Sequence, residues 1–274
     1  MSERTGKTDQ EASAEAIDRV HTAAALSISP ELFEQLYLAP KTAVRGELRQ
    51  TFGNPTPIAL GGFLLCTTPL SMILLEWQGA GGIAGAANVG SYFFLGGLLL
   101  VLGGIGEWII GNTFPSTVFC TFGGFWLTMG ATICPGYGAY AIYSPSGSPS
   151  EGLTEPQFFA TFSFFLIGMT ILCAVYTIAS IRTNIVLFSI LLLLVPCFAC
   201  LSASFFAVSH GQTGPAIVFQ HAGAALLLVV SLLGWYIFFA LILLSVEFPF
   251  NLPLGDLSTL VSGMKKRTTE KEHV

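Results

Sequence analysis

The side chains that could act as acids, bases or metal ligands lie at the ends of long apolar stretches. Glu76, Glu107 and Glu247 each close such a stretch. A membrane enzyme needs reactive groups in its core, and a carboxylate proton relay needs them at membrane depth. The sequence contains no phosphate loop, no H-E-x-x-H pair and no cluster of metal ligands. It therefore predicts a protein that is not an enzyme and that binds no metal or cofactor.

The first polar side chain suited to bind a solute is Asn54. It precedes Pro55 and Pro57, which tolerate the first turn of a helix but bias the residues before them away from helix. The Asn54 amide can cap that helix. It can also donate a hydrogen bond to a carboxylate at the positive end of the helix. We predict that Asn54, Pro55 and Pro57 form a solute entry; the alternative is an ordinary helix start.

His221 is the second candidate, because histidine is the side chain that changes charge near neutral pH. It lies in the outer part of the last apolar stretch, within Gln220-His221-Ala222-Gly223. A histidine placed there can sense or carry a proton. The alternative, a neutral histidine bonded to a neighbouring helix, stays open.

The six cysteines all lie in apolar stretches. Cys197 and Cys200 form a C-x-x-C pair, but no second pair or ligand cluster accompanies them. We therefore predict small buried side chains in place of a disulfide framework, a redox site or a metal site.

The elements that must position these residues are membrane helices. Of the 274 residues, 53% are hydrophobic and 10% are charged, whereas soluble domains carry about 25% charged residues. Several apolar runs exceed the roughly 18 residues needed to cross a bilayer. We predict an all-α integral membrane protein, a bundle of six transmembrane helices at residues 55–75, 91–110, 116–140, 157–181, 184–208 and 216–246.

Polar segments flank the predicted bundle. We assign residues 1–50 to an N-terminal tail, 51–250 to the transmembrane transport domain and 251–274 to a C-terminal tail. In the first tail, Ser29 is a good helix cap and Pro30 suits the first helical position. A short amphipathic helix is predicted to begin there and to lie on the membrane surface or against the bundle.

Basic residues predict the orientation. All eleven Lys and Arg residues lie in the N-terminal tail, at Arg182 or in the C-terminal tail. With six spans, these three places fall on one side of the membrane. The opposite loops contain Glu76, Glu151 and Glu155 but no Lys or Arg. The positive-inside rule predicts that both termini are cytoplasmic.

Glycines are frequent within the predicted spans, where small residues let helix backbones approach closely. We assign most of them to helix packing. A few can instead leave room for a permeating solute, and Gly234 in the last span is our candidate for the entry path.

Three short motifs stand out in the sequence: Asn54-Pro55-Thr56-Pro57 with the small and apolar residues that follow, Gly111-Asn112-Thr113-Phe114 and Pro253-Leu254-Gly255-Asp256. They resemble the motifs of the acetate uptake transporters, the family of the succinate–acetate permease and the fungal acetate permeases. Thr56, Ile58 and Ala59 depart slightly from the usual residues of the first motif.

The resemblance implies six-helix protomers assembled into a homo-hexamer, each protomer with its own pore. It also implies a narrow apolar constriction, formed by Phe63, Phe122 and Leu194. Many family members have Tyr at the place of Phe122, so a hydrogen bond from its hydroxyl is lost here. An apolar ring passes a small dehydrated monocarboxylate and opposes larger or more hydrated ions. The polar tails resemble those of fungal plasma-membrane members.

We therefore expect transport of acetate and other short-chain monocarboxylates, with succinate as a further candidate, by a channel-like or a proton-coupled mechanism. One alternative is a pore for another small solute, such as ammonia or water. Uptake of radiolabelled acetate would distinguish this alternative from an acetate transporter. The other is a membrane sensor or assembly subunit that transports nothing. In that case deletion of the tails would abolish function, whereas substitutions at the constriction would not.

Overall fold

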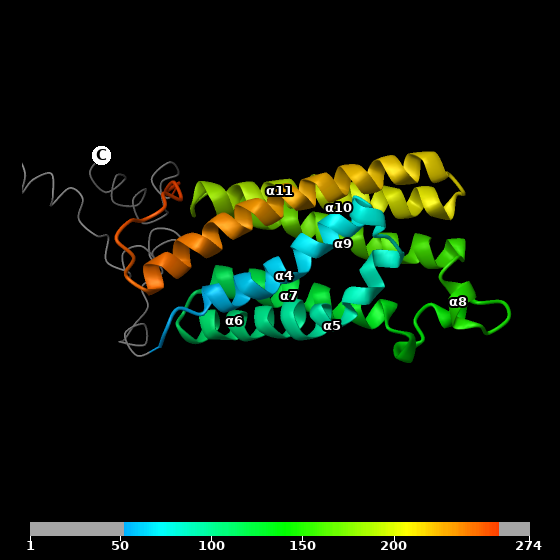
Figure 1. The fold of residues 1–274 in the computed structure, drawn as a ribbon, viewed down its shortest axis with the longest axis horizontal. Coiled ribbons are helices and arrows are strands. Elements are labelled where there is room, and N and C mark those ends of the chain that lie inside the picture. Colours follow the sequence, from blue (N-terminus) through cyan, green and yellow to red (C-terminus); the bar gives the residue numbers. More distant parts are fainter. Residues whose placement is uncertain (1–51, 258–274) are drawn as a thin grey trace, which may run out of the picture. The chain divides into compact units, whose positions relative to one another are not determined.

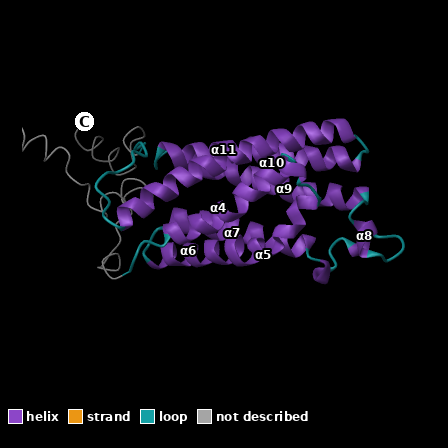
Figure 2. Cartoon of the chain, viewed as in Figure 1, coloured by secondary structure: helices purple, strands orange, loops and turns teal. Residues whose placement is uncertain are grey.

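The computed structural model of the chain describes residues 52–257. The predicted amphipathic helix, the N-terminal tail and most of the C-terminal tail lie outside the described residues. Figure 2 shows helices and loops throughout the described part, which confirms the predicted all-α class. The long helical segments are α4 (Thr56–Leu74), Gly85–Ile109 ending in α6 (Leu98–Ile109), α7 (Thr113–Ile133), α9 (Pro156–Ser180), α10 (Ile185–Ser209) and α11 (Thr213–Ser245).

Five segments of residues 52–257 are long and apolar enough to cross a membrane: Thr56–Leu74, Gly85–Ile109, Pro156–Ser180, Ile185–Ser209 and Thr213–Ser245. The remaining long helix, α7, has 21 residues, enough for a hydrocarbon core of roughly 30 Å. Its threonines make it more polar. Thr117, Thr121, Thr128 and Thr132 each donate to the carbonyl oxygen four residues earlier, so their hydroxyls are satisfied within the helix. The count of six spans stays a prediction.

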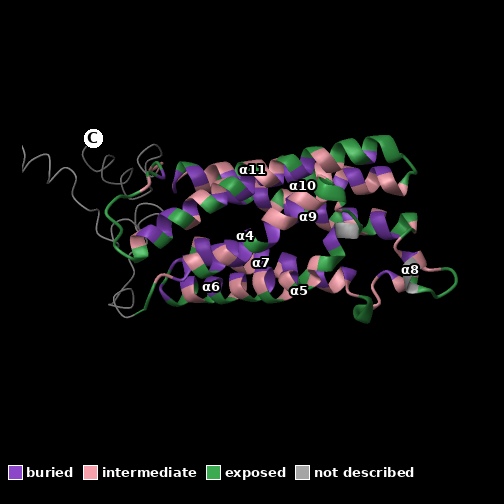
Figure 3. Cartoon of the chain, in the orientation of Figure 1, coloured by how far each residue is buried: buried purple, intermediate pink, exposed green. Residues whose placement is uncertain are grey.

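The long helices pack as neighbours in the order α7, α6, α4, α11, α10 and α9 (Figure 1). Aromatic side chains join the two ends of this series. The hydroxyl of Tyr176 on α9 lies 3.0 Å from that of Thr121 on α7, and the rings of Phe125 and Phe165 stack with centroids 6.0 Å apart. The helices therefore surround a common interior. Buried residues alternate with exposed ones along the long helices (Figure 3).

Two adjacent glycines of α6 let this helix approach two different neighbours. A Cβ on Gly103 would lie 2.6 Å from the Cβ and 2.9 Å from the backbone nitrogen of Ala59 on α4. A Cβ on Gly104 would lie 2.5 Å from the Sγ of Cys120 on α7. Both positions thus require glycine, as expected for helices that pack closely in lipid.

The second span differs from the prediction. The segment long and apolar enough to cross a membrane begins at Gly85, before the predicted start at Ser91. It passes through η2 (Ile83–Asn88) and α5 (Val89–Ser91) into η3 (Tyr92–Gly97), whose backbone has the π pattern. The π pattern joins residues five apart and widens the helix locally. Propensity gives no indication of this segment, because helix propensities do not distinguish a π turn from an α turn.

The third span also differs. The prediction extended it to Tyr140, but α7 ends at Ile133 and Cys134 is extended, with φ −74° and ψ 120°. The cause is Pro135, whose ring disfavours helical geometry in the residue before it. Short 3-10 helices follow, η4 (Pro135–Tyr137) and η5 (Ala141–Tyr143).

A loop follows η5 from Ser144 and ends in α8 (Pro149–Gly152). The Glu151 carboxylate accepts hydrogen bonds from the hydroxyls of Ser146 and Ser144 and from the Ser146 backbone N–H. These bonds hold the pKa of the Glu151 carboxyl below its usual value. The loop is therefore organised by its own side chains.

The third motif folds back onto the start of α10. Asn184 pairs with Asp256 in an isolated antiparallel bridge, and the Gly255 carbonyl accepts from the Ile185 N–H at 2.8 Å. Gly255 has a φ of +69°, and a Cβ there would lie 2.7 Å from the Cγ2 of Ile185. The turn thus needs glycine for its conformation and for its space.

Candidate functional site

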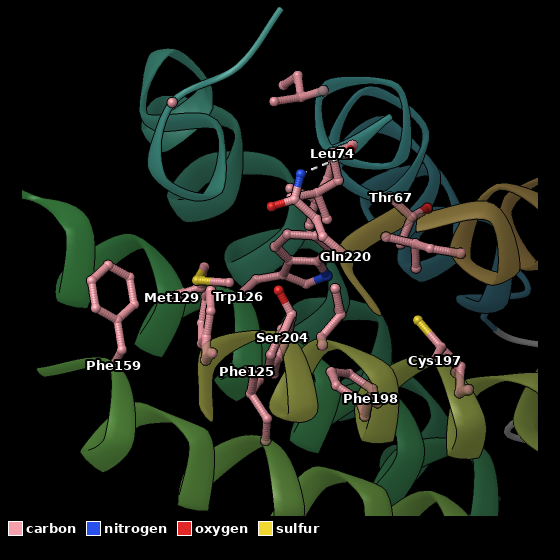
Figure 4. A pocket seen from close by; sticks show the side chains of 18 of the residues that line it. Thr67, Leu74, Phe125, Trp126, Met129, Phe159, Cys197, Phe198, Ser204 and Gln220 are labelled. Carbon is pink, nitrogen blue, oxygen red and sulfur yellow. Dashed lines mark hydrogen bonds between the residues drawn. The ribbon is translucent and has the colours of Figure 1, made fainter. Parts of the chain in front are cut away.

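The interior of the helix series contains a cavity of about 310 Å³. Its wall is mostly aromatic and aliphatic and comes from α4, α7, α9, α10 and α11 (Figure 4). The cavity extends along α4 from Phe63 past Leu74 to Glu76 and the following glycines, Gly81 and Gly82. It therefore occupies the half of the bundle that lies away from the start of α4.

The three residues of the predicted constriction line the same cavity. Phe63, Phe122 and Leu194 all line this cavity, and all three are buried. The rings of Phe63 and Phe122 meet edge to face with centroids 6.2 Å apart. Each residue lies seven to nine positions after the start of its helix, which puts all three at a depth of about 10–14 Å. Phe198 backs Phe122, with ring centroids 6.5 Å apart.

Gly234 lies beside this trio but does not line the cavity. A Cβ on Gly234 would be 2.8 Å from the Cδ2 of Leu64 and 3.7 Å from the Cε1 of Phe63. The glycine lets α11 pack against α4 next to the Phe63 ring. This position supports a role of Gly234 in helix packing. A direct role in the solute entry stays a prediction.

The predicted entry residues lie elsewhere, at the start of α4. The Asn54 Oδ1 accepts from the Thr56 backbone N–H at 2.9 Å, so the amide oxygen satisfies one donor of the first turn. Pro55 is buried and packs close to Gly106 of α6, and Pro57 follows in the same turn. Asn54 lies nine residues before Phe63, about 13 Å along the helix axis, so the structure does not bring the two groups together.

Glu107 connects the first two motifs, a role that the sequence did not reveal. Its carboxylate accepts from the Thr56 hydroxyl and, at 2.6 Å, from the Asn112 side-chain amide. Glu107 is fully buried and Asn112 is 3% exposed. A buried carboxylate held by two side-chain donors ties the start of α4 to the turn between α6 and α7. The only indication in the sequence was the polar pair Glu107 and Asn112 at the end of an apolar run.

His221 lies near the mouth of the cavity. Its Nε2 is 3.9 Å from the Oε2 of Glu76, and both side chains are about half exposed. The neighbouring Gln220 lines the cavity and donates from Nε2 to the Leu74 carbonyl oxygen at 2.9 Å. The His221 imidazole therefore has a carboxylate within range of a favourable charge interaction when it is protonated.

The CxxC pair separates into two environments. Cys197 lines the cavity, is 1% exposed and donates from Sγ to the Gly223 carbonyl oxygen at 3.3 Å. Cys200 is partly buried, and all six cysteines are free thiols. Cys197 thus serves the contact between α10 and α11.

Membrane-length helices around a mostly apolar cavity are the architecture of a membrane transport protein of the channel or carrier type. The chain belongs to the GPR1/FUN34/yaaH family, whose model matches residues 38–259. This confirms the family resemblance drawn from the three motifs.

Relatives and one solved structure extend the comparison. Protein alcS of Aspergillus fumigatus is 44% identical over 85% of this chain and 86% of its own length. Acetate transporter protein patA of Aspergillus clavatus is 33% identical over 78% and 82%. Ammonia transport outward protein 2 of Saccharomyces cerevisiae is 29% identical over 74% and 72%. The bacterial acetate channel SatP shares the fold, with a TM-score of 0.54 and 20% identity over 74% of this chain and 99% of that chain.

Proposed function

We propose that this protein conducts acetate, and other short monocarboxylates, across a membrane through the cavity of each protomer. The observation that carries the proposal is that Phe63, Phe122 and Leu194, all buried and on three different helices, line one apolar cavity. The relative patA, named an acetate transporter, supports acetate as the solute.

An apolar constriction selects by size and by the cost of dehydration, because it offers no charge to replace the hydration shell. Among the lining residues of the described part, Glu76 at the mouth is the only charged side chain. A small monocarboxylate crosses such a ring more easily than a larger acid or a dicarboxylate such as succinate. In this proposal the constriction is the gate.

A flux measurement on the purified protein in liposomes tests the proposal. Radiolabelled acetate should enter protein-containing liposomes much faster than empty ones. Ammonia is the competing solute, because one relative is named for outward ammonia transport; its entry is followed by the rise in internal pH. Protein-dependent movement of ammonia without acetate would overturn the proposal.

Acetate flux that follows an imposed pH gradient indicates proton coupling, for which His221 beside Glu76 is our candidate. Flux indifferent to the gradient indicates a channel.

We further propose that α7 is the sixth span, and that both termini face the cytoplasm at the plasma membrane. The positive-inside distribution of Lys and Arg supports this orientation. A membrane-impermeant thiol reagent applied outside should modify Ser148→Cys, which is exposed in the loop before α8, and should not modify Ser258→Cys in the C-terminal tail. The unsubstituted protein is the control, because its described cysteines are buried or partly buried. The reverse labelling pattern would contradict the orientation.

We propose that the Asn54 amide contacts the solute at the cytoplasmic entry. Asn54→Ala should reduce acetate flux several-fold while expression stays close to normal, because losing a helix cap costs only about 1 kcal/mol. The matched variant is Asn54→Asp, which keeps the oxygen that accepts from Thr56 but loses the amide donor. Reduced flux in both variants supports solute contact. Normal flux in the aspartate variant would assign Asn54 to capping alone.

The family resemblance implies a hexamer, and we keep this as a prediction. Large apolar side chains are exposed along the segment that contains α5 and α6, including Phe94 and Trp108 at 68% and 69%. Lipid or a neighbouring copy would cover such a surface. The molar mass of the purified protein, corrected for bound detergent, distinguishes a single protomer covered by lipid from an assembly of several copies.

A further inference from the structure

Trp126 has an unused hydrogen-bond donor inside the cavity. The residue is 2% exposed and lines the cavity. Its indole nitrogen is buried, and no protein acceptor lies within hydrogen-bond distance in the described part of the chain. A buried donor without an acceptor destabilises the fold. Packing alone therefore does not account for an indole N–H at this place.

The other polar side chains of the cavity wall already donate within the protein. Thr67 donates to the Phe63 carbonyl oxygen at 2.9 Å, and Ser204 donates to the Ala216 carbonyl oxygen at 2.8 Å. The third, Gln220, is bonded to the Leu74 carbonyl oxygen at the mouth. Trp126 is therefore the donor deep in this cavity that remains available to a solute.

The indole is held in one orientation by its neighbours. The Tyr92 ring lies 5.0 Å from it between centroids and the Phe125 ring 5.3 Å. A Cβ on Gly96 would lie 2.6 Å from the Cγ of Trp126. The missing side chain of Gly96 therefore leaves the space that the indole occupies. Figure 4 shows the indole nitrogen facing into the cavity, among Thr67, Ser204 and Gln220.

We propose that the Trp126 indole N–H donates a hydrogen bond to a carboxylate oxygen of a short monocarboxylate that waits on the cavity side of the constriction. The proposal rests on the function proposed above and assigns a binding residue to that site. Trp126 follows Phe122 by four residues on α7, so both side chains share one helix face about 6 Å apart.

The chemistry of indole fits a transport subsite. An indole nitrogen donates and does not accept, so it favours a carboxylate over an ammonium ion, which also only donates. A single neutral donor binds an anion weakly, and weak binding lets the solute leave through the gate. An arginine or lysine in this place would hold the anion more strongly.

The test is Trp126→Phe, which keeps an aromatic ring and removes the donor. The half-saturating acetate concentration of flux in liposomes should rise about tenfold, the effect of losing one hydrogen bond to a charged group, while the maximal rate changes less. The matched control is Trp235→Phe on α11. It also loses an indole hydrogen bond, to the Thr68 hydroxyl at 2.9 Å, but does not line the cavity, so its half-saturating concentration should stay unchanged.

A second variant keeps the shape of the indole, so a change in its flux cannot be attributed to altered packing. Benzothienylalanine at position 126 preserves the shape of the indole and replaces its N–H with sulfur. It should raise the half-saturating concentration as Trp126→Phe does. Unchanged half-saturation in either folded variant would overturn the assignment of Trp126 and leave acetate transport standing, with water as the partner of the indole. Absence of acetate flux in the unsubstituted protein would instead overturn the proposed function.

Discussion

Leu194→Ala will let larger acids such as lactate or succinate pass, with less discrimination in favour of acetate. Leu194 is 2% exposed and lines the cavity beside Phe63 and Phe122. Truncating a side chain that closes a ring widens the ring. Phe122 does not turn to fill the space, because its ring packs against Phe198. The measurement is the ratio of lactate to acetate flux in liposomes, which should rise by about an order of magnitude if the barrier falls by about 1.4 kcal/mol.

Loss of stability must be separated from loss of selectivity. A buried Leu→Ala substitution costs about 2–5 kcal/mol wherever it is made. Leu191→Ala is the matched control, because Leu191 lies on the same helix and is 1% exposed, yet does not line the cavity. It should lower the midpoint of thermal unfolding similarly without changing the flux ratio. An unchanged ratio in Leu194→Ala would show that the gate lies elsewhere.

Gly103→Val will prevent α6 from packing against α4 and will largely abolish the folded protein. The new Cβ would meet both the Cβ and the backbone nitrogen of Ala59, and neither atom can turn aside as the end of a flexible side chain can. Overpacking costs up to about 3 kcal/mol or more when the helices must separate. We expect a sharp fall in the yield of monodisperse protein and in its unfolding midpoint.

The control for this substitution is Gly168→Val on α9. Gly168 is exposed, and no atom lies within 4 Å of a Cβ built there. A valine at this site changes the helix propensity by less than about 1 kcal/mol, so the unfolding midpoint should barely move. Equal losses in the two variants would mean that glycine content, and not the approach of α6 to α4, determines stability.

Helix starts were predictable from the sequence to within a few residues where a proline or an asparagine marks them. Pro55 precedes α4, and Asn184 caps α10 by accepting from the Leu187 N–H at 2.8 Å. The end of α7 was predicted wrongly because apolar residues continue after Pro135. Hydropathy measures the preference for lipid, whereas the ring of Pro135 disfavours helical geometry at Cys134 and so ends the helix.

The candidate site was only partly accessible from the sequence. The trio of Phe63, Phe122 and Leu194 came from the family resemblance, because periodicity does not show which aromatic residues of a membrane helix face inward. Trp126 could have been found from its spacing of four residues after Phe122. Glu107 could not, because its contact with Thr56 joins residues 51 positions apart.

The π segment Tyr92–Gly97 has a consequence for the evolutionary record of the helix. A π turn contains about one residue more than an α turn, and the turns on either side can keep their partners. This one falls where Tyr92 meets Trp126 and where Gly96 makes room for the indole. A relative with a plain α-helix here would need one residue fewer in this segment to keep the same contacts on both sides. An alignment of two such chains without a gap in this segment would pair each residue on one side of it with the wrong counterpart.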